Sequence, residues 1–409
     1  IGESVGIDDL ITLDMGGTSC DVALIYHGMM TQTTSGSVGG HPVAIRMNDI
    51  HTIGAGGGSI AWVDSGGALR VGPRSAGAMP GPACYGHGGE LATVSDAHVV
   101  LGHLRPEWPL GGTTRVDVHA AFAAMERLAK RLRLSVERTA IGVLRVADAS
   151  MERAVRLISV ERGYDPRDFA MVAFGGAGPL HAASIAARLS IPRVIVPAVA
   201  GVLSAAGLLG CMTGREYGQS VVRRISRLTV ADVASFLEGL LSRGYREVAE
   251  DELDEANVSV EISADLRYFG QSHELNVMCP DASGRLSEAT LIAWKDAFHR
   301  EHRNRFGHAS EEEVEMVALR VRMTGPASFQ YSDLTRDRDE ALRHSQWADV
   351  WFGPDGPQKT LIADRRRSRE GDRVQGPAVL WAPDSTLLVP PGLTAACDGL
   401  GTMILEVVP

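Results

Sequence analysis

The chain opens with two short apolar segments that are separated by glycine. Ile11 and Leu13 alternate with polar neighbours, and residues 22–25 form a continuous apolar run. Both patterns are typical of β-strands. Because Gly16 and Gly17 lie between the two segments, the sequence predicts a β-hairpin with a glycine turn.

Apolar residues then recur at helical spacing in two consecutive segments. The first follows Asp117, a candidate helix cap, and ends near Leu132. The second runs from about Ala140 to Ile158 and stops before Gly163. The spacing predicts two helices. We interpret their apolar faces as core, because stripes at this spacing pack inside globular domains.

A strand, a glycine-rich turn and a helix follow these two helices. Residues 169–174 are mostly apolar, residues 175–178 read Gly-Gly-Ala-Gly, and a helical pattern covers residues 180–189. Residues 193–197 predict a further buried strand. Strands that alternate with helices are typical of the α/β class.

Beyond residue 217 the pattern changes. A helix is predicted over Val230–Glu250, alternating strands over 258–268 and 273–278, and a helix near 291–305. Further short strands are expected near residues 314–323, 350–352, 359–362, 378–381 and 403–408, with a linker over 336–343. We therefore predict two domains, residues 1–217 and a strand-rich α+β domain of residues 218–409.

Composition and charge narrow the class of protein. The 409 residues are 44% hydrophobic and 22% charged, as in a globular protein of two or three domains, and the net charge is -10. This acidic balance argues against a nucleic-acid partner. The five cysteines form no C-x-x-C pair, so we expect neither a zinc site nor a disulfide framework, and a reducing cytoplasm fits.

Targeting and membrane signals are weak. The uncharged stretch 194–212 is long enough to cross a bilayer, but Pro197 and several glycines interrupt it, so we expect no membrane partner. The chain starts at Ile1 rather than methionine and has no basic-then-apolar leader. We expect a fragment or a processed piece located in the cytoplasm.

The predicted hairpin has the chemistry of a phosphate site. Glycines can reach positive φ and turn their N–H groups inward, which creates an anion-binding concavity. Asp14 and Asp21 bracket the turn, and a carboxylate can hold Mg²⁺ or its waters against phosphate oxygens. Thr18 adds a hydroxyl donor. The alternative is an ordinary tight hairpin whose acids face solvent.

A second candidate nucleotide site is the turn formed by Gly175, Gly176, Ala177 and Gly178. A glycine turn that leads from a strand into a helix presents free backbone N–H groups and the positive end of the helix dipole. His181 lies in the first turn of that helix, where a packed side chain and a ligand are both reasonable interpretations.

Two more segments are candidates for substrate contact. Gly56 and Gly57 belong to a glycine-rich run, and Arg74 and Ser75 lie in a loop rich in proline and glycine over residues 72–86. Long ordered loops often carry function. For the glycines, close packing of backbone on backbone is an equally good explanation.

Four strings in one order resemble the hydantoinase A / 5-oxoprolinase family, which includes N-methylhydantoinase A and acetone carboxylase beta-like proteins. They are residues 14–18, residues 53–59, residues 72–86 apart from 78–79, and residues 174–182. The resemblance continues through Gly163-Tyr164-Asp165 to Asp384-Ser385-Thr386, so it covers nearly the whole chain. The sequence departs from the family pattern at Cys20, Met79 and His98, and the departures at Met79 and His98 leave the acidity of the substrate side open.

This resemblance implies an actin-like ATPase lobe of the ribonuclease H-like type. By that analogy the segment from Asp14 to Asp21 is the second-lobe phosphate hairpin with two catalytic aspartates, Asp14 holds Mg²⁺, and residues 175–178 hold the adenosine of ATP. The first-lobe hairpin of the family is absent, which implies a fragment that lacks the N-terminal lobe.

The resemblance also implies a reaction. The complete protein would be an ATP-dependent hydrolase of cyclic amides of the hydantoin or 5-oxoproline type, and this subunit would phosphorylate the substrate carbonyl. A hydantoinase B-like subunit or domain would complete the reaction, and we expect an oligomer. The alternatives are the ATPase subunit of an acetone or acetophenone carboxylase and a non-catalytic, nucleotide-responsive interaction module. The sequence does not choose the substrate.

Overall fold

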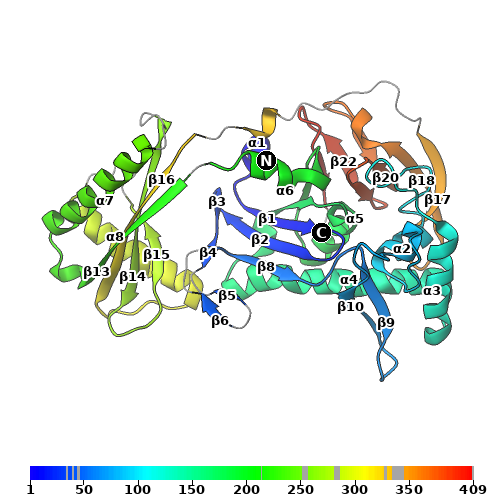
Figure 1. Cartoon of the computed structure of the whole chain (residues 1–409), viewed down its shortest axis with the longest axis horizontal. Helices are drawn as coiled ribbons and strands as arrows, with labels where there is room; N and C mark the ends of the chain where they lie inside the picture. The colour runs from blue at the N-terminus through cyan, green and yellow to red at the C-terminus, as the bar shows by residue number, and fades with distance from the viewer. Residues whose placement is uncertain are drawn as a thin grey trace. The chain divides into compact units, whose positions relative to one another are not determined.

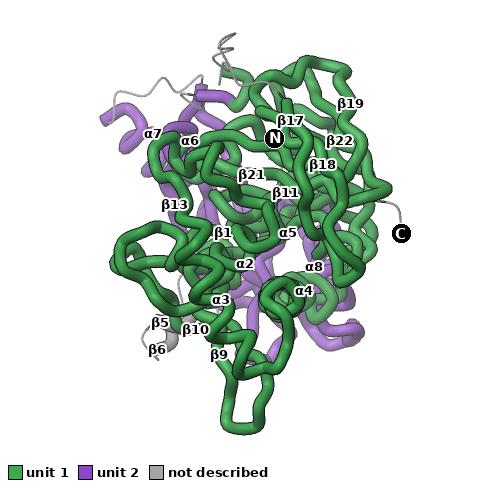
Figure 2. The backbone as a smooth tube through the Cα atoms, turned by 90° about the vertical axis from the view of Figure 1, so that its right-hand side faces the viewer, with its two compact units in different colours: residues 1–206, 331–409 green, residues 207–330 purple. Residues whose placement is uncertain are grey.

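The computed structural model describes residues 1–33, 36–38, 41–43, 47–212, 214–250, 257–280, 286–326, 329–333 and 345–407. The chain forms two compact units, one of residues 1–206 with 331–409 and one of residues 207–330 (Figure 2). The predicted linker over 336–343 lies outside the described residues.

A nine-stranded sheet forms the centre of the first unit (Figure 1). Its path runs β19-β22-β23-β12-β11-β1-β2-β3, and β8 pairs with β2. The bounds are β1 Leu10–Met15, β2 Cys20–Tyr26, β3 Met29–Met30, β8 Ile50–Ile53, β11 Ala170–Phe174, β12 Arg193–Val196, β19 Arg373–Gln375, β22 Thr394–Cys397 and β23 Met403–Glu406.

The middle of this sheet is parallel. β11 runs parallel to β1 on one side and to β12 on the other, whereas β2 is antiparallel to β1. The predicted hairpin and the predicted α/β class are therefore confirmed. Alternation along β1 buries Leu13 and Met15 and leaves Thr12 and Asp14 partly exposed, as expected for a strand with one fully packed face.

Six α-helices belong to the described part of the first unit, and α4 and α5 pack on its central sheet. Their bounds are α1 Gly2–Val5, α2 Val94–Val100, α3 Val118–Leu132, α4 Val136–Ile158, α5 Gly178–Leu189 and α6 Leu203–Leu209, with the boundary between the units inside α6. α5 packs on β1, β11 and β12, and α4 packs on β2 and β8. Asp117 caps α3 by accepting a hydrogen bond from the Ala120 N–H at 3.0 Å, as predicted.

Smaller sheets complete the first unit. β9 (Ser59–Val63) pairs with β10 (Leu69–Ser75), and a four-stranded sheet has the order β17-β18-β20-β21. Its strands are β17 Gln346–Trp351, β18 Pro357–Asp364, β20 Ala378–Trp381 and β21 Thr386–Val389, and α5 also packs on β21. Two short pairs are β4 (Gln32–Thr33) with β7 (Met47–Asn48) and β5 (Gly36–Val38) with β6 (His41–Val43).

The second unit is an antiparallel sheet with two helices. The strand order is β13-β16-β14-β15, with β13 Gly214–Arg224, β14 Ser259–Tyr268, β15 Leu275–Met278 and β16 Val314–Thr324. α7 (Val230–Glu250) packs on β13 and β16, and α8 (Glu288–Phe306) packs on β15. Their shared core contains the fully buried side chains of Trp294, Tyr268 and Phe298.

The observed division of the chain differs from the predicted domains of residues 1–217 and 218–409. The second unit is an insertion of residues 207–330, and residues 331–409 return to the first unit. The physical reason is strand pairing: β23 pairs antiparallel with β12 and buries Met403 and Leu405 in the first core. No helix among the described residues is long and apolar enough to cross a membrane.

Candidate functional site

The hairpin turn between β1 and β2 is open on its outer side. The Gly16 N–H donates to the Ser19 carbonyl at 3.1 Å, which closes the turn. Neither Gly16 nor Gly17 has a positive φ, so the expected reason for glycine is wrong here. A Cβ added at either position would meet no atom within 4 Å. The glycines thus leave the backbone of the turn accessible rather than relieving strain.

Asp14 and Asp21 face each other across the hairpin as a directly opposed pair. Asp14 Oδ2 accepts a hydrogen bond from the Ser204 hydroxyl at 2.7 Å, and Asp21 Oδ1 accepts one from the Thr52 hydroxyl at 2.5 Å. Burial raises the pKa of Asp14, and the neighbouring Asp21 raises it further, while the Ser204 hydrogen bond lowers it. This environment favours a bound cation, which would relieve the repulsion between the carboxylates.

The second glycine turn packs directly on the end of β1. The Ala177 N–H donates to the Met15 carbonyl and the Gly175 N–H to the Ala200 carbonyl, both at 2.9 Å. Gly175 has φ +76, and a Cβ there would lie 2.4 Å from the Met15 carbonyl oxygen. Glycine is therefore required at 175 both by conformation and by space.

The two glycine turns line one cavity of about 190 Å³. Gly16 and Gly17 come from the hairpin, and Gly176 and Ala177 come from the turn before α5. The two turns therefore meet at one edge of the sheet. The cause is the parallel pairing of β1 with β11, which puts the carboxyl ends of both strands at the same edge.

The glycine-rich run 54–58 is a packing element as well as part of the wall. The Gly57 N–H donates to the Gly16 carbonyl at 3.0 Å, and a Cβ at Gly56 would lie 2.5 Å from the backbone of Gly17. Gly57 also lines the cavity. The structural explanation therefore holds for Gly56, and Gly57 fits both explanations.

The other predicted substrate residues lie elsewhere. Arg74 is exposed and lines a separate surface cavity of about 370 Å³ together with Trp62 and Arg127. Ser75 accepts a hydrogen bond from the Gly77 N–H at 3.1 Å within its own loop. Thr18 is exposed at the tip of the hairpin.

Another wall of the cavity comes from the C-terminal segment, which sequence reasoning did not assign to the site. Asp384 and Ser385 in the turn between β20 and β21, and Thr386 at the start of β21, line the cavity. Asp384 Oδ2 accepts a hydrogen bond from the Gly201 N–H at 2.7 Å. The fully buried Arg365 donates to the Ser385 hydroxyl at 2.8 Å. The only sequence signal for this wall was the resemblance of its Asp-Ser-Thr string.

A third wall comes from η1 and α2. Tyr85, Ser95 and His98 line the cavity, with Tyr85 in the short 3-10 helix η1 (Ala83–Tyr85). α2 is fixed by a capping box in which Thr93 and Asp96 exchange hydrogen bonds. Asp96 also accepts a hydrogen bond from the Cys84 N–H at 2.7 Å, which ties η1 to α2.

A family model described as hydantoinase/oxoprolinase matches residues 1–216. The chain belongs to this family. Among curated members, the alpha subunit of caprolactamase from Pseudomonas jessenii is 34% identical over 98% of this chain and 59% of the relative. 5-Oxoprolinase 1 from Arabidopsis thaliana is 30% identical over 98% of this chain and 32% of the relative. The acetone carboxylase beta subunit from Xanthobacter autotrophicus is 28% identical over 98% of this chain and 58% of the relative.

Solved structures of family members have the same fold. The ATP-dependent caprolactamase from Pseudomonas jessenii superposes with a TM-score of 0.86 at 33% identity, over all of this chain and 60% of that one. Nucleotide-free acetone carboxylase gives a TM-score of 0.77 at 27% identity, over all of this chain and 59% of that one. The chain thus spans about three fifths of the length of each of these two solved proteins.

Proposed function

We propose that the cavity between the two glycine turns binds ATP and that the first unit is an actin-like ATPase lobe. The observation that carries the proposal is the convergence of Gly17 and Gly176 on one cavity. The related caprolactamase from Pseudomonas jessenii is ATP-dependent, which supports the same ligand.

The geometry suits phosphate at the hairpin and adenosine at the second turn. Gly16 and Gly17 expose backbone that no side chain covers, so phosphate oxygens can approach it. The 12-residue helix α5 begins at Gly178, and its N-terminal dipole favours negative charge at this place. A Cβ at Gly176 would meet only the Asp384 carbonyl oxygen, at 3.7 Å, so this surface is flat enough for adenosine.

Magnesium belongs beside Asp14. The opposed carboxylates of Asp14 and Asp21 and the Ser204 hydroxyl are hard oxygen ligands, which suit Mg²⁺ together with waters and phosphate oxygens. When bound, the cation would neutralise charge on the phosphates during transfer. The protein's own part is to hold Asp14 in place through the Ser204 hydrogen bond, close to the backbone of Gly175.

The reaction that best fits the family is hydrolysis of a cyclic amide. Amides are poor electrophiles, and transfer of the γ-phosphoryl group of ATP to the amide oxygen would turn that oxygen into part of a leaving group. Water would then add to the carbonyl carbon, and the ring C–N bond would break as a proton passes to the nitrogen. Hydrolysis of the resulting acyl phosphate by a second water would release inorganic phosphate and the carboxylate. We infer that a hydantoinase B-like subunit or domain supplies these hydrolytic steps and that the complete protein is an oligomer, since the relatives include enzyme subunits named alpha, beta and gamma.

The second candidate is the ATPase subunit of a ketone carboxylase. The similarity to the acetone carboxylase beta subunit and its structure supports this candidate. Hydrolysis of a cyclic amide ranks first because, of the two solved proteins described above, the caprolactamase is more similar to this chain in identity and in TM-score. A nucleotide-responsive module without catalysis is the third candidate.

An ATPase assay of the complete protein with its partner subunit separates these candidates. The proposal expects a cyclic amide such as 5-oxoproline, hydantoin or caprolactam to stimulate hydrolysis of Mg·ATP. Opening of the amide ring should accompany this hydrolysis. Stimulation by acetone or acetophenone with bicarbonate would favour the carboxylase. Nucleotide binding without stimulation by either class would favour the interaction module.

A further inference from the structure

A continuous row of buried polar groups runs behind the wall of the cavity. Asp148 Oδ1 lies 2.6 Å from His181 Nδ1, and His181 Nε2 lies 3.1 Å from His98 Nε2. His98 Nδ1 lies 2.8 Å from His103 Nδ1, and His103 Nε2 lies 2.7 Å from the Trp351 carbonyl oxygen. We call these four side chains and that carbonyl the imidazole row. All four residues are at most 6% exposed.

The four contacts of the imidazole row need four protons. Each contact is a hydrogen bond only if one of its two atoms carries a hydrogen. Both ends of the row are acceptors, because a carboxylate and a carbonyl oxygen have no proton to give. Three neutral imidazoles carry one ring proton each, which is one too few. The missing proton would leave two lone pairs facing each other in a buried contact.

The geometry points to an imidazole row that retains a fourth proton, held between Asp148 and His181, and through it fixes the first turn of α5 against α2 at the cavity. In this state His181 donates to His98 Nε2, His98 donates from Nδ1 to His103, and His103 donates from Nε2 to the Trp351 carbonyl. Every contact then has one proton. His98 and His181 are thereby positioning residues of the proposed nucleotide site, so this role rests on the proposed function.

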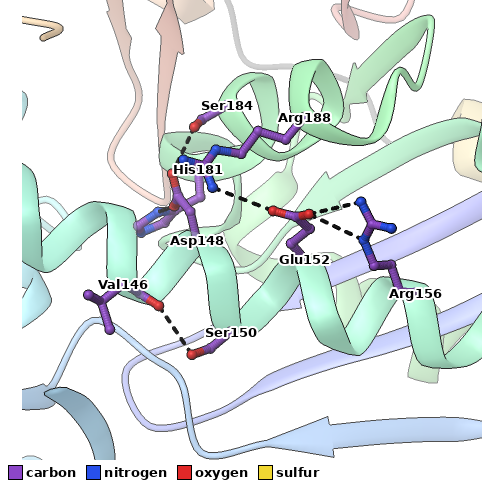
Figure 3. A network of polar contacts seen from close by, with 8 residues as sticks. All are labelled: Val146, Asp148, Ser150, Glu152, Arg156, His181, Ser184 and Arg188. Carbon is purple, nitrogen blue, oxygen red and sulfur yellow. Dashed lines mark hydrogen bonds and ion pairs between the residues drawn. The ribbon is translucent and has the colours of Figure 1, made fainter.

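Charge and burial favour the same place for the fourth proton. Among the described residues no arginine or lysine bonds to Asp148, whose second oxygen accepts from the Ser184 hydroxyl at 2.8 Å (Figure 3). A buried carboxylate without a cation is costly, and a proton shared with His181 removes that cost. Burial lowers the pKa of His98 well below its usual value and that of His103 to about 4, so these rings stay neutral.

Other ionisable groups lie near the imidazole row without bonding to it. On α4, Glu152 is one turn from Asp148 and pairs with Arg156 and with Arg188 of α5 (Figure 3). Tyr85 of η1 shares the cavity wall with His98, and burial raises its pKa. Among the residues that the structure describes, none of these groups supplies a proton to the four contacts of the imidazole row.

The consequence for the cavity follows from the elements that the imidazole row joins. His181 lies in the first turn of α5, directly after the glycine turn of residues 175–178. His98 lies on α2 beside Ser95, and both line the cavity. Loss of the fourth proton at high pH would break one hydrogen bond of the row and loosen the link between α5, α2 and β17.

Neutron diffraction from deuterium-exchanged crystals of the complete protein tests the proton count directly. The proposal expects deuterium on His98 Nδ1, on His103 Nε2 and on both nitrogens of His181 or shared with Asp148. Deuterium on His98 Nε2 and His103 Nδ1, with a bare nitrogen facing the Trp351 carbonyl, would overturn it. This outcome does not depend on any nucleotide.

The variant Asp148→Asn provides a second test, because an amide N–H can supply the fourth proton permanently. The wild-type protein should lose stability as pH rises and the row loses its proton, and its affinity for Mg·ADP should fall in parallel. Asp148→Asn should keep both at high pH, whereas Asp148→Ala should be unstable at every pH. His119→Gln, which changes an exposed histidine on α3, should behave like wild type.

The fourth proton of the imidazole row and the proposed nucleotide site can be rejected independently of each other. Identical pH profiles of unfolding temperature for wild type and Asp148→Asn would reject the fourth proton. Deuterium at the expected atoms together with no binding of Mg·ADP would keep the imidazole row and reject the proposed function.

Discussion

Asp14, the proposed magnesium ligand, has a cost in stability. Its carboxylate is half-buried, lies opposite Asp21 and has a raised pKa, for which burial is the main cause. A carboxyl group whose pKa is raised by folding stabilises the protein only at low pH, and this contribution is lost as pH rises through the raised value. At neutral pH the ionised Asp14 therefore destabilises the free protein.

Asp14→Asn should separate these two effects. In the complete enzyme we expect kcat to fall by about a hundredfold or more while nucleotide affinity changes less, because the lost charge acts through the metal. Thermal unfolding should show a higher Tm than wild type at neutral pH and the same Tm at acidic pH. Near-normal turnover of the Asn variant would mean that the hairpin is only structural.

Local residue patterns predicted part of the site. The hairpin aspartates, Gly17 and Gly176 stand in recognisable strand and turn contexts, so their placement could be inferred. Asp384 and the contact between His98 and His181 could not, because their partners lie 183 and 83 residues away in sequence. A lone histidine on a helix carries no signal of which ring it will meet.

At the scale of elements, the site depends on backbone packed on backbone. The run 54–58 lies against the hairpin turn, and the turn of residues 175–178 lies against the end of β1. Parallel pairing of β1 with β11 explains why segments about 160 residues apart share one edge. The two glycine turns, the longer helices and many of the strands were predictable, since each has its own period and its own cap or breaker. Strands such as β8, β13 and β22 were not predicted.

Gly56→Ala tests this packing. A Cβ would lie 2.5 Å from the Gly17 backbone, so we expect a loss of stability of roughly 1–3 kcal/mol and weaker nucleotide binding together. Gly66→Ala is the matched control, because a Cβ there meets only Asp64 Oδ1 at an ordinary 3.4 Å. Chemical denaturation and calorimetry measure both effects. Equal stability of the two variants would contradict the packing role.

At the scale of the whole molecule, the C-terminal segment completes the first unit. Pairing of β12 with β23 joins Arg193 to Glu406, and the turn after β20 forms a cavity wall. The sequence could not predict this, because a short apolar strand looks the same whichever sheet it joins. The change in pattern beyond residue 217 lies ten residues after the start of the inserted unit at residue 207, and nothing in the sequence marked its end at residue 330.

Deletion of the inserted unit tests the observed division. A chain of residues 1–206 joined by a short linker to 331–409 should unfold cooperatively, since the Tyr331 hydroxyl already lies 3.0 Å from the Ala198 backbone nitrogen. A chain of residues 1–217 should not, because it lacks β22 and β23. Calorimetric unfolding distinguishes the two. Cooperative unfolding of residues 1–217 alone would show that the C-terminal strands are dispensable.

The central claim is that the two glycine turns form one nucleotide site. Calorimetric titration with Mg·ATP of the complete protein and of its Gly176→Val variant tests this claim. A side chain at 176 has space in the free protein, so the fold should persist, but it would fill the adenosine surface. The control is Gly239→Val on the exposed face of α7, where a Cβ meets no atom within 4 Å. We predict a Kd about tenfold or more weaker for Gly176→Val and unchanged for Gly239→Val. Wild-type affinity in a folded Gly176→Val protein would contradict the account.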